Sequence, residues 1–189
     1  MSSSIATRTG DQGLTGLLYG QRVSKDHPQI EAVGAFDELN AAIGIAKANC
    51  PNLPRARELE ELQNNLIALM GELACSEADV PRYQQSKFSK IGENELARVD
   101  AAVAELEAKH LSFKGWATPG ANPHSAALEF ARTVARRGER RLVALPQTGR
   151  HPRPVLLQFV NRMADLLWLM AREAEQTNSP SPSPPTTPN

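Results

Sequence analysis

The sequence is poor in cysteine, poor in aromatic residues and without an excess of either charge. Its two cysteines, Cys50 and Cys75, are too few and too isolated to define a disulfide framework or a zinc site, which agrees with a reducing cytoplasm. Aromatic residues make up 5% of the chain and hydrophobic residues 41%, which favours an aliphatic core over that of a β-sandwich. Because 21 basic residues balance 21 acidic ones, nucleic acid is not an expected partner.

Long apolar runs are also missing. No window approaches the ~18 apolar residues of a membrane span, and the opening "MSSSIATRTG" lacks the apolar run of a signal peptide. We therefore expect a soluble, cytoplasmic protein without a membrane partner. The last stretch, residues 178–189, has five prolines and nothing to bury, so we expect it to be disordered.

Helical periodicity dominates what is present. Leucines at 59, 62, 66, 69 and 73 follow a 3-4-3-4 spacing, and a second seam runs through Leu96, Val99, Val103, Leu106 and His110. Three more helices are expected over 30–48, 124–145 and 155–176, with residues 80–91 irregular. No strand pattern of useful length appears, so the sequence predicts an all-α five-helix bundle over 26–177, preceded by a loop region over 1–25.

The N-terminal loop is rich in residue types that bind anions. It contains Gly10, Gly13, Gly16 and Gly20, with Thr7, Thr9, Thr15, Arg8, Arg22 and Lys25 among them. Glycines let backbone N–H groups approach a ligand, while hydroxyl groups and cations add further contacts. The alternative interpretation is a cluster of surface turns.

A second concentration of charge lies in "LEFARTVARRGERRLVAL". Arg132, Arg136 and Arg140 recur every four residues, with Arg137 and Arg141 on the adjacent stripe, which indicates a basic ridge on one helix. Arginine matches phosphate oxygens well. The ridge is also compatible with a solvated face paired to Glu129 and Glu139.

Polar residues interrupt two apolar helical seams. Asn161 and Asp165 lie one turn apart in the last helix, and "FDELN" places Asp37, Glu38 and Asn40 in the first. Several such groups together suggest a polar site, in which the acidic side chains pair with arginines of another helix or another subunit.

Four separated stretches carry a resemblance to a known family. They are "TRTGDQGLTGLLYGQRVSKD", "AVGAFDELNAAIG", "ARTVARRGERRLVAL" and "FVNRMADLLWLMAR". In order and spacing they resemble the propanediol-utilisation type of ATP:cob(I)alamin adenosyltransferase, from about Thr7 to Arg172.

The resemblance implies a homotrimer with ATP between neighbouring subunits. The expected loop contacts are Thr7, Arg8, Thr9, Gly10, Thr15, Gly16 and Lys25, and the expected bundle contacts are Arg136, Arg137, Glu139, Arg140 and Asn161, with Asp165 nearby. Asp37 and Arg132 correspond to an inter-subunit ion pair that shapes the site. The implied reaction is attack of cobalt(I) on the 5′ carbon of ATP, giving adenosylcobalamin and triphosphate.

In this reaction the protein supplies no covalent nucleophile and no metal ligands of its own. It would align the carbon with cobalt and neutralise the leaving triphosphate with Arg, Lys and Mg²⁺. A corrin reductase and an adenosylcobalamin-dependent enzyme are the further partners implied. The four histidines are scattered and are interpreted as ordinary residues.

This chain departs from the family pattern at three positions. Trp116 stands where the family usually has the phenylalanine that keeps the lower ligand of the corrin away, and Glu129 and Gly138 replace a usual histidine and alanine. Glu129 can pair with the ridge, while a glycine within a helix costs roughly 1 kcal/mol relative to alanine. Two other functions stay open, namely a delivery or sensing protein that binds ATP or adenosylcobalamin with little catalysis, and a structural trimer.

Overall fold

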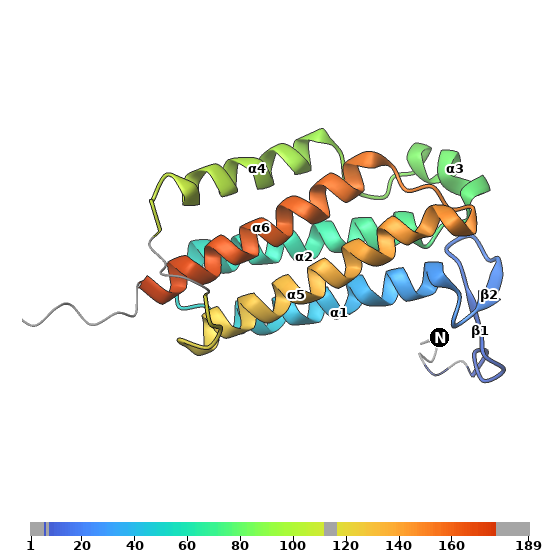
Figure 1. Ribbon diagram of the computed structural model, residues 1–189. Coiled ribbons are helices and arrows are strands. Elements are labelled where there is room, and N and C mark those ends of the chain that lie inside the picture. Colours follow the sequence, from blue (N-terminus) through green and yellow to red (C-terminus); the bar gives the residue numbers. More distant parts are fainter. Residues whose placement is uncertain (1–5, 7, 112–116, 177–189) are drawn as a thin grey trace, which may run out of the picture.

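Five long helices lie side by side and form a bundle (Figure 1). The computed structural model describes residues 6, 8–111 and 117–176. The long helices are α1 (Pro28–Ala48), α2 (Leu53–Leu73), α4 (Glu93–Glu107), α5 (Pro123–Ala144) and α6 (Pro154–Gln176). Helix α1 packs on α2 and α5, α6 packs on α5 and α4, and the core lies between them.

The apolar seams explain this packing. All five leucines of the α2 seam are buried, as are Val99, Val103 and Leu106 of α4. Several helices also begin at side-chain caps followed by proline. At the start of α5, the Asn122 side chain accepts a hydrogen bond from the Ser125 N–H at 2.8 Å, and Pro123 occupies the first turn. The helices expected over 30–48, 124–145 and 155–176 are confirmed as α1, α5 and α6, and their ends agree within two residues. The first leucine seam, over 59–73, is confirmed within α2.

The second seam was predicted with one member too many, His110, which lies three residues beyond the end of the helix. Helix α4 ends at Glu107, and His110 is exposed with a φ of 49°. An exposed imidazole contributes nothing to an apolar seam, and the left-handed backbone there cannot continue a helix. The prediction that residues 80–91 are irregular was wrong for Val80–Gln85, which form the short helix α3.

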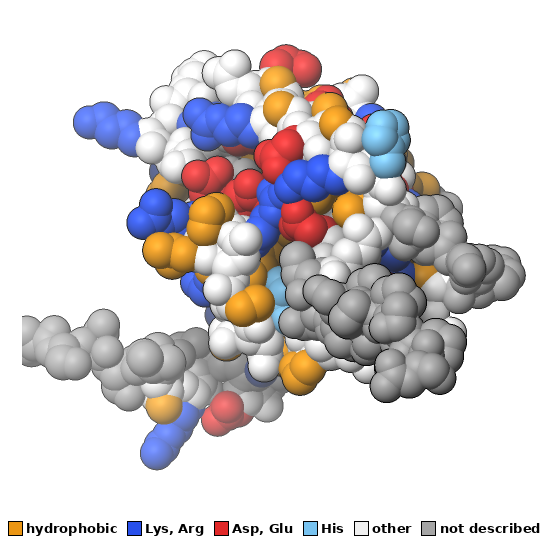
Figure 2. Space-filling model, turned by 90° about the vertical axis from the view of Figure 1, so that its left-hand side faces the viewer, with side chains coloured by type: hydrophobic (Ala, Val, Ile, Leu, Met, Phe, Trp, Pro, Cys, Tyr) orange, Lys and Arg blue, Asp and Glu red, His pale blue; other side chains and the backbone are white. Residues whose placement is uncertain are grey.

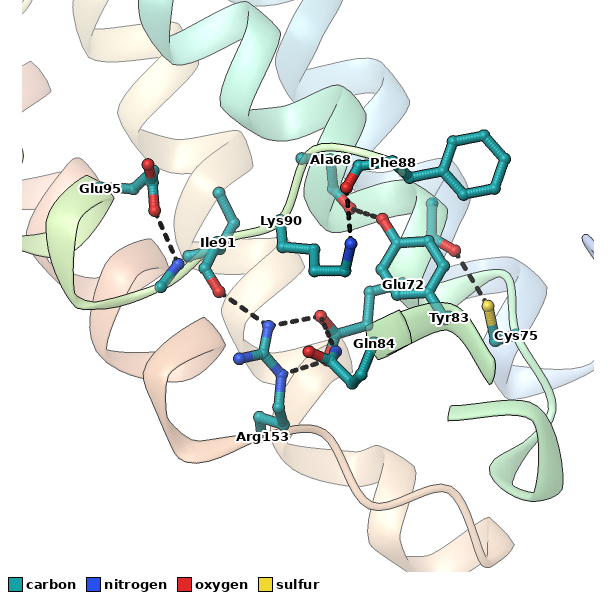
Figure 3. Close-up of polar contacts among 12 residues, drawn as sticks. Ala68, Glu72, Cys75, Tyr83, Gln84, Phe88, Lys90, Ile91, Glu95 and Arg153 are labelled. Carbon is teal, nitrogen blue, oxygen red and sulfur yellow. Dashed lines mark hydrogen bonds and ion pairs between the residues drawn. The ribbon is translucent and has the colours of Figure 1, made fainter. Parts of the chain in front are cut away.

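Helix α3 is held by a buried polar cluster between α2 and the start of α6 (Figure 3). Glu72, fully buried in α2, accepts hydrogen bonds from Nε and Nη2 of Arg153 at 2.8 and 2.6 Å. The Tyr83 hydroxyl lies 3.0 Å from the Ala68 carbonyl oxygen, and burial raises the pKa of Tyr83 to about 12. These long-range contacts order a segment whose own sequence has no helical period.

A second charged cluster joins α2, α4 and α6 at the opposite end of the bundle. Arg55, which is 8% exposed, donates hydrogen bonds to Glu58, Glu105 and Glu173. Lys109 adds a 2.6 Å contact to Glu173. Figure 2 looks onto this end of the molecule, where acidic and basic side chains lie next to one another.

No helix in the described ranges is long and apolar enough to cross a membrane.

Candidate functional site

The glycine-rich N-terminal stretch folds as a small β-hairpin. Strands β1 (Leu14–Gly16) and β2 (Arg22–Ser24) pair antiparallel, with Thr15 opposite Val23. The sequence predicted an all-α fold with a loop region over residues 1–25 and missed these strands, because three-residue strands are too short to show alternation. The Arg22 guanidinium donates to the carbonyl oxygens of Thr9 and Leu14 at 2.7 and 3.2 Å, which folds the preceding loop back onto the hairpin.

One glycine of this loop has a clear steric role. A Cβ at Gly10 would lie 2.9 Å from Nζ of Lys25, so the absence of a side chain lets the ammonium group lie against the backbone. The Lys25 N–H also donates to the Gly13 carbonyl oxygen at 2.8 Å. Two of the predicted loop contacts, Gly10 and Lys25, are therefore brought together.

The hairpin is attached to the end of the bundle beside the start of α1 (Figure 1). The Leu18 N–H donates to the Ala74 carbonyl oxygen at 2.9 Å, and the Gln21 amide donates to Asp79. The Arg82 guanidinium lies 3.9 Å from the centre of the Tyr19 ring. Of the other predicted loop residues, Arg8, Thr9 and Gly16 are exposed and Thr15 is half-buried, while Thr7 lies outside the described residues.

A cavity of about 340 Å³ lies between α5 and α6. It is lined by Arg132, Arg136, Ala164, Asp165 and Trp168. Beside it, Glu139 accepts from Arg136 at 2.8 Å and from the Asn161 amide at 2.9 Å. The fold thus brings together five of the residues predicted from the sequence, which are Arg132, Arg136, Glu139, Asn161 and Asp165.

Sequence reasoning missed Trp168 as a wall of this cavity. It stands in the apolar run "LLWLM" and follows Asp165 by three residues, which places both on one face of α6. That spacing from a predicted site residue was the available signal.

The rest of the ridge is largely paired to α1. Arg137 forms an ion pair with Glu38, and Arg141 lies 3.2 Å from Glu31. These two arginines thus pair with α1 and not with Glu129 or Glu139, and the role of Arg137 as a bundle contact stays a prediction. Arg140 is exposed and makes no ion pair within the described ranges.

Arg132 is paired within its own helix. Its Nε donates to Oε2 of Glu129 at 2.7 Å, and Oε1 of the same carboxylate accepts from Arg172 at 2.9 Å. The sequence-based interpretation that Glu129 pairs with the ridge is confirmed. Asp37, the expected inter-subunit partner of Arg132, is exposed on α1.

The loop and the ridge stay apart within one chain. Among the described residues, no hydrogen bond or ion pair joins Arg8, Gly10 or Lys25 to α5 or α6. Trp116 lies outside the described residues, so its predicted role is untested. In the ranges that the structure describes, no group of three or more His, Cys, Asp or Glu side chains is placed to hold a metal ion.

Comparison with known proteins covers nearly the whole described chain. The family described as Cobalamin adenosyltransferase matches residues 5–174. Corrinoid adenosyltransferase PduO of Citrobacter freundii is 40% identical over 179 residues, which is 93% of this chain and 52% of that protein. The chain thus spans about half the length of that relative. A shorter Corrinoid adenosyltransferase of Citrobacter freundii is 36% identical and is covered over 96% of its length.

A solved structure has the same architecture. It is a variant PduO-type ATP:corrinoid adenosyltransferase from Lactobacillus reuteri complexed with cobalamin and ATP, with a TM-score of 0.81 and 30% identity. The match covers 92% of this chain and 91% of that one. With the family pattern matched over residues 5–174, the chain belongs to the cobalamin adenosyltransferase family.

Proposed function

We propose that this protein transfers the 5′-deoxyadenosyl group of ATP to cob(I)alamin. The observation that carries the proposal is the cavity between α5 and α6, where Arg132 and Arg136 lie beside the Glu139–Asn161 pair. Guanidinium groups suit triphosphate oxygens, and Trp168 adds an aromatic wall. The relatives named above carry the same activity in their names.

In this reaction the protein would align the 5′ carbon of ATP with cobalt and neutralise the charge of the leaving triphosphate. Cobalt(I) donates an electron pair to the 5′ carbon of ATP, the carbon–oxygen bond to the triphosphate breaks, and the triphosphate leaves with that bond's electrons. Cobalt becomes formally cobalt(III) in the new cobalt–carbon bond. Arg132 and Arg136 would stabilise the charge that develops on the leaving group, and no side chain acts as a nucleophile.

Mg²⁺ would enter this site with the nucleotide. The described residues offer no preformed set of three ligands, and Mg²⁺ usually binds through phosphates and one or two carboxylates. Asp165, exposed at the cavity, is the carboxylate placed to assist it.

The second half of the site would come from a neighbouring subunit in a homotrimer. In one chain the hairpin lies at the end of the bundle, whereas Arg132 and Arg136 lie in the middle of α5. Loop residues of one subunit, among them Arg8, Thr9 and Lys25, would bind the triphosphate against the arginines of the next. Asp37 would then face Arg132 across the interface.

Trp116 is the aromatic residue proposed to displace the lower ligand of the corrin. If so, Trp116→Ala leaves ATP binding intact and lowers the fraction of four-coordinate cobalt(II) seen by electron paramagnetic resonance with ATP present, while Trp116→Phe retains it. The activity also requires a source of reduced corrinoid and a consumer of its product, so a corrin reductase and an adenosylcobalamin-dependent enzyme are the proposed protein partners.

The test is an assay with ATP and chemically reduced cob(I)alamin. We expect the absorption change of cobalt–carbon bond formation, with one triphosphate released for each adenosylcobalamin formed. A reaction without ATP is the control. ATP binding without any cobalt–carbon bond would instead establish a binding protein and overturn the proposed transfer.

A further inference from the structure

Glu129 lies at the centre of a buried chain of charges behind the cavity. The residue is 3% exposed, and its carboxylate links Arg132 on α5 to Arg172 on α6. Arg172 is 2% exposed, and its guanidinium carbon lies 5.5 Å from the centre of the Trp168 ring. Because Arg132 and Trp168 both line the cavity, this series of contacts connects two of its walls.

The geometry of the Glu129–Arg132 contact leaves one edge of the guanidinium available. Only Nε of Arg132 donates to Glu129, and among the described residues neither terminal nitrogen of Arg132 has a hydrogen-bond partner. The Arg132 side chain is 31% exposed. A guanidinium held at Nε keeps both terminal nitrogens available, so that one can donate to a phosphate oxygen while the other faces Asp37 of a neighbouring subunit in the proposed trimer.

The other contacts of Glu129 explain why it makes a rigid anchor. Arg172 donates hydrogen bonds to Glu129 at 2.9 Å and to Glu175 at 2.8 Å. The buried carboxylate of Glu129 is therefore itself held in place from α6. Removing one partner of a buried charged group is costly, because the charge that remains has lost its compensation. Arg132 is therefore oriented from a carboxylate that cannot move independently of both helices.

We propose that Glu129 is a positioning residue that orients Arg132 into the cavity and thereby sets the affinity for the triphosphate of ATP. This inference rests on the proposed function, since it takes the cavity as the nucleotide site. Glu129 does not contact the nucleotide. Its effect passes through Arg132, so it must disappear when Arg132 is removed.

The experiment compares Glu129→Gln with Glu175→Gln in the full-length protein. Both variants remove one carboxylate from Arg172, but only the first also removes the anchor of Arg132. By isothermal titration without corrinoid, we expect Glu129→Gln to raise the ATP Kd by about tenfold or more, because a charge-assisted contact is misplaced. Glu175→Gln should stay within about twofold, as usual for a site that does not couple to the ligand.

A double-mutant cycle separates positioning from a purely structural role. In an Arg132→Ala background, Glu129→Gln should leave the ATP Kd unchanged while still lowering the thermal midpoint. If Glu129→Gln does not fold, the combined Glu129→Gln/Arg172→Met variant removes the buried charge together with its partner and should show the same loss of ATP affinity.

Two results would overturn the inference while leaving the proposed function intact. One is a folded Glu129→Gln protein that binds ATP as tightly as the parent, and the other is an additive effect of Glu129→Gln in the Arg132→Ala background. A parent protein that binds ATP but forms no cobalt–carbon bond would instead contradict the proposed transfer. Because the readout here is ATP binding, the two failures are distinct.

Discussion

At Gly138, packing against a neighbouring helix favours glycine, although glycine has a low helix propensity. It is buried in α5, and a Cβ at this position would lie 2.8 Å from Cε1 of Phe36 on α1. The ring of Phe36, fully buried, occupies the space that a methyl group would need. The glycine that departs from the family's usual alanine is therefore matched to a large neighbour.

We expect Gly138→Ala to destabilise the protein despite its better helix propensity. Alanine gains up to ~1 kcal/mol in a helix, but overpacking a buried site costs typically about 1–3 kcal/mol. The measurement is the free energy of unfolding in urea. Gly34→Ala is the matched control, because a Cβ there meets nothing within 4 Å in the chain and should be neutral or stabilising. Equal stabilisation in both variants would contradict the packing argument.

At the candidate site, Arg136→Ala and Lys25→Ala should each weaken ATP binding. Each change removes a cation proposed to contact phosphate oxygens, and a hydrogen bond to a charged group is worth about 1.5–3 kcal/mol, or roughly tenfold or more in Kd. Isothermal titration with ATP measures it. Arg141→Ala serves as control, since Arg141 is already paired to Glu31 on α1. Unchanged affinity in both test variants would place the anion site elsewhere.

At the scale of the elements, charged side chains join helices that also share the apolar core. Glu173 on α6 accepts from Arg55 on α2 at 2.7 Å and from Lys109, just beyond α4, at 2.6 Å. Burial alone would raise the pKa of Glu173, but the hydrogen bonds from Arg55 and Lys109 outweigh it and lower the pKa below its ordinary value of 4.5. The ionised form is thus favoured by folding.

This depressed pKa predicts a specific acid sensitivity. Stability from Glu173 is present above its unfolded pKa and is lost as pH falls through the lower folded pKa. Glu173→Gln should therefore lower the free energy of unfolding at pH 7 by roughly 1–3 kcal/mol, and the difference from the parent should shrink on acidification below about pH 4. Urea titrations at several pH values measure it, with the exposed Glu107→Gln as control. A difference that does not change with pH would exclude the linkage.

At the scale of the whole molecule, the single chain holds two sets of anion-binding residue types that do not meet. The hairpin is tied to the α2–α3 region through Leu18 and Gln21, while Arg132 and Arg136 lie along α5. Asp37 is exposed on α1. A site that needs both sets requires a second copy of the chain.

We expect light scattering to give a mass three times the 20.6 kDa of one chain. Asp37→Asn should weaken the assembly, because Arg132 would lose its proposed partner across the interface. A double-mutant cycle with Arg132→Ala should show coupling between the two positions. A monomer that still binds ATP tightly would contradict the shared site.

The periodic and compositional features were readable without tertiary information. A 3-4-3-4 spacing places all five leucines on one face of a helix, so α2 was predictable from the sequence. The spans of α1, α5 and α6 were predictable as well. The arginine spacing likewise placed Arg132 and Arg136 on one face of α5. Family membership followed from four stretches that lie far apart in the sequence but keep their order.

Only the tertiary structure decided which polar residues meet. Helix α3 is joined to α2 by the Tyr83 hydroxyl, which donates to the Ala68 carbonyl oxygen, and by the Gln84 amide, which donates to Glu72, so local pattern could not reveal it. Trp168 became a cavity wall, and Glu129 came to accept a hydrogen bond from Arg172, because α5 and α6 pack face to face. Helix periodicity specifies which side of a helix is buried, but the pairing of charges across helices depends on the packing register, which no single helix contains.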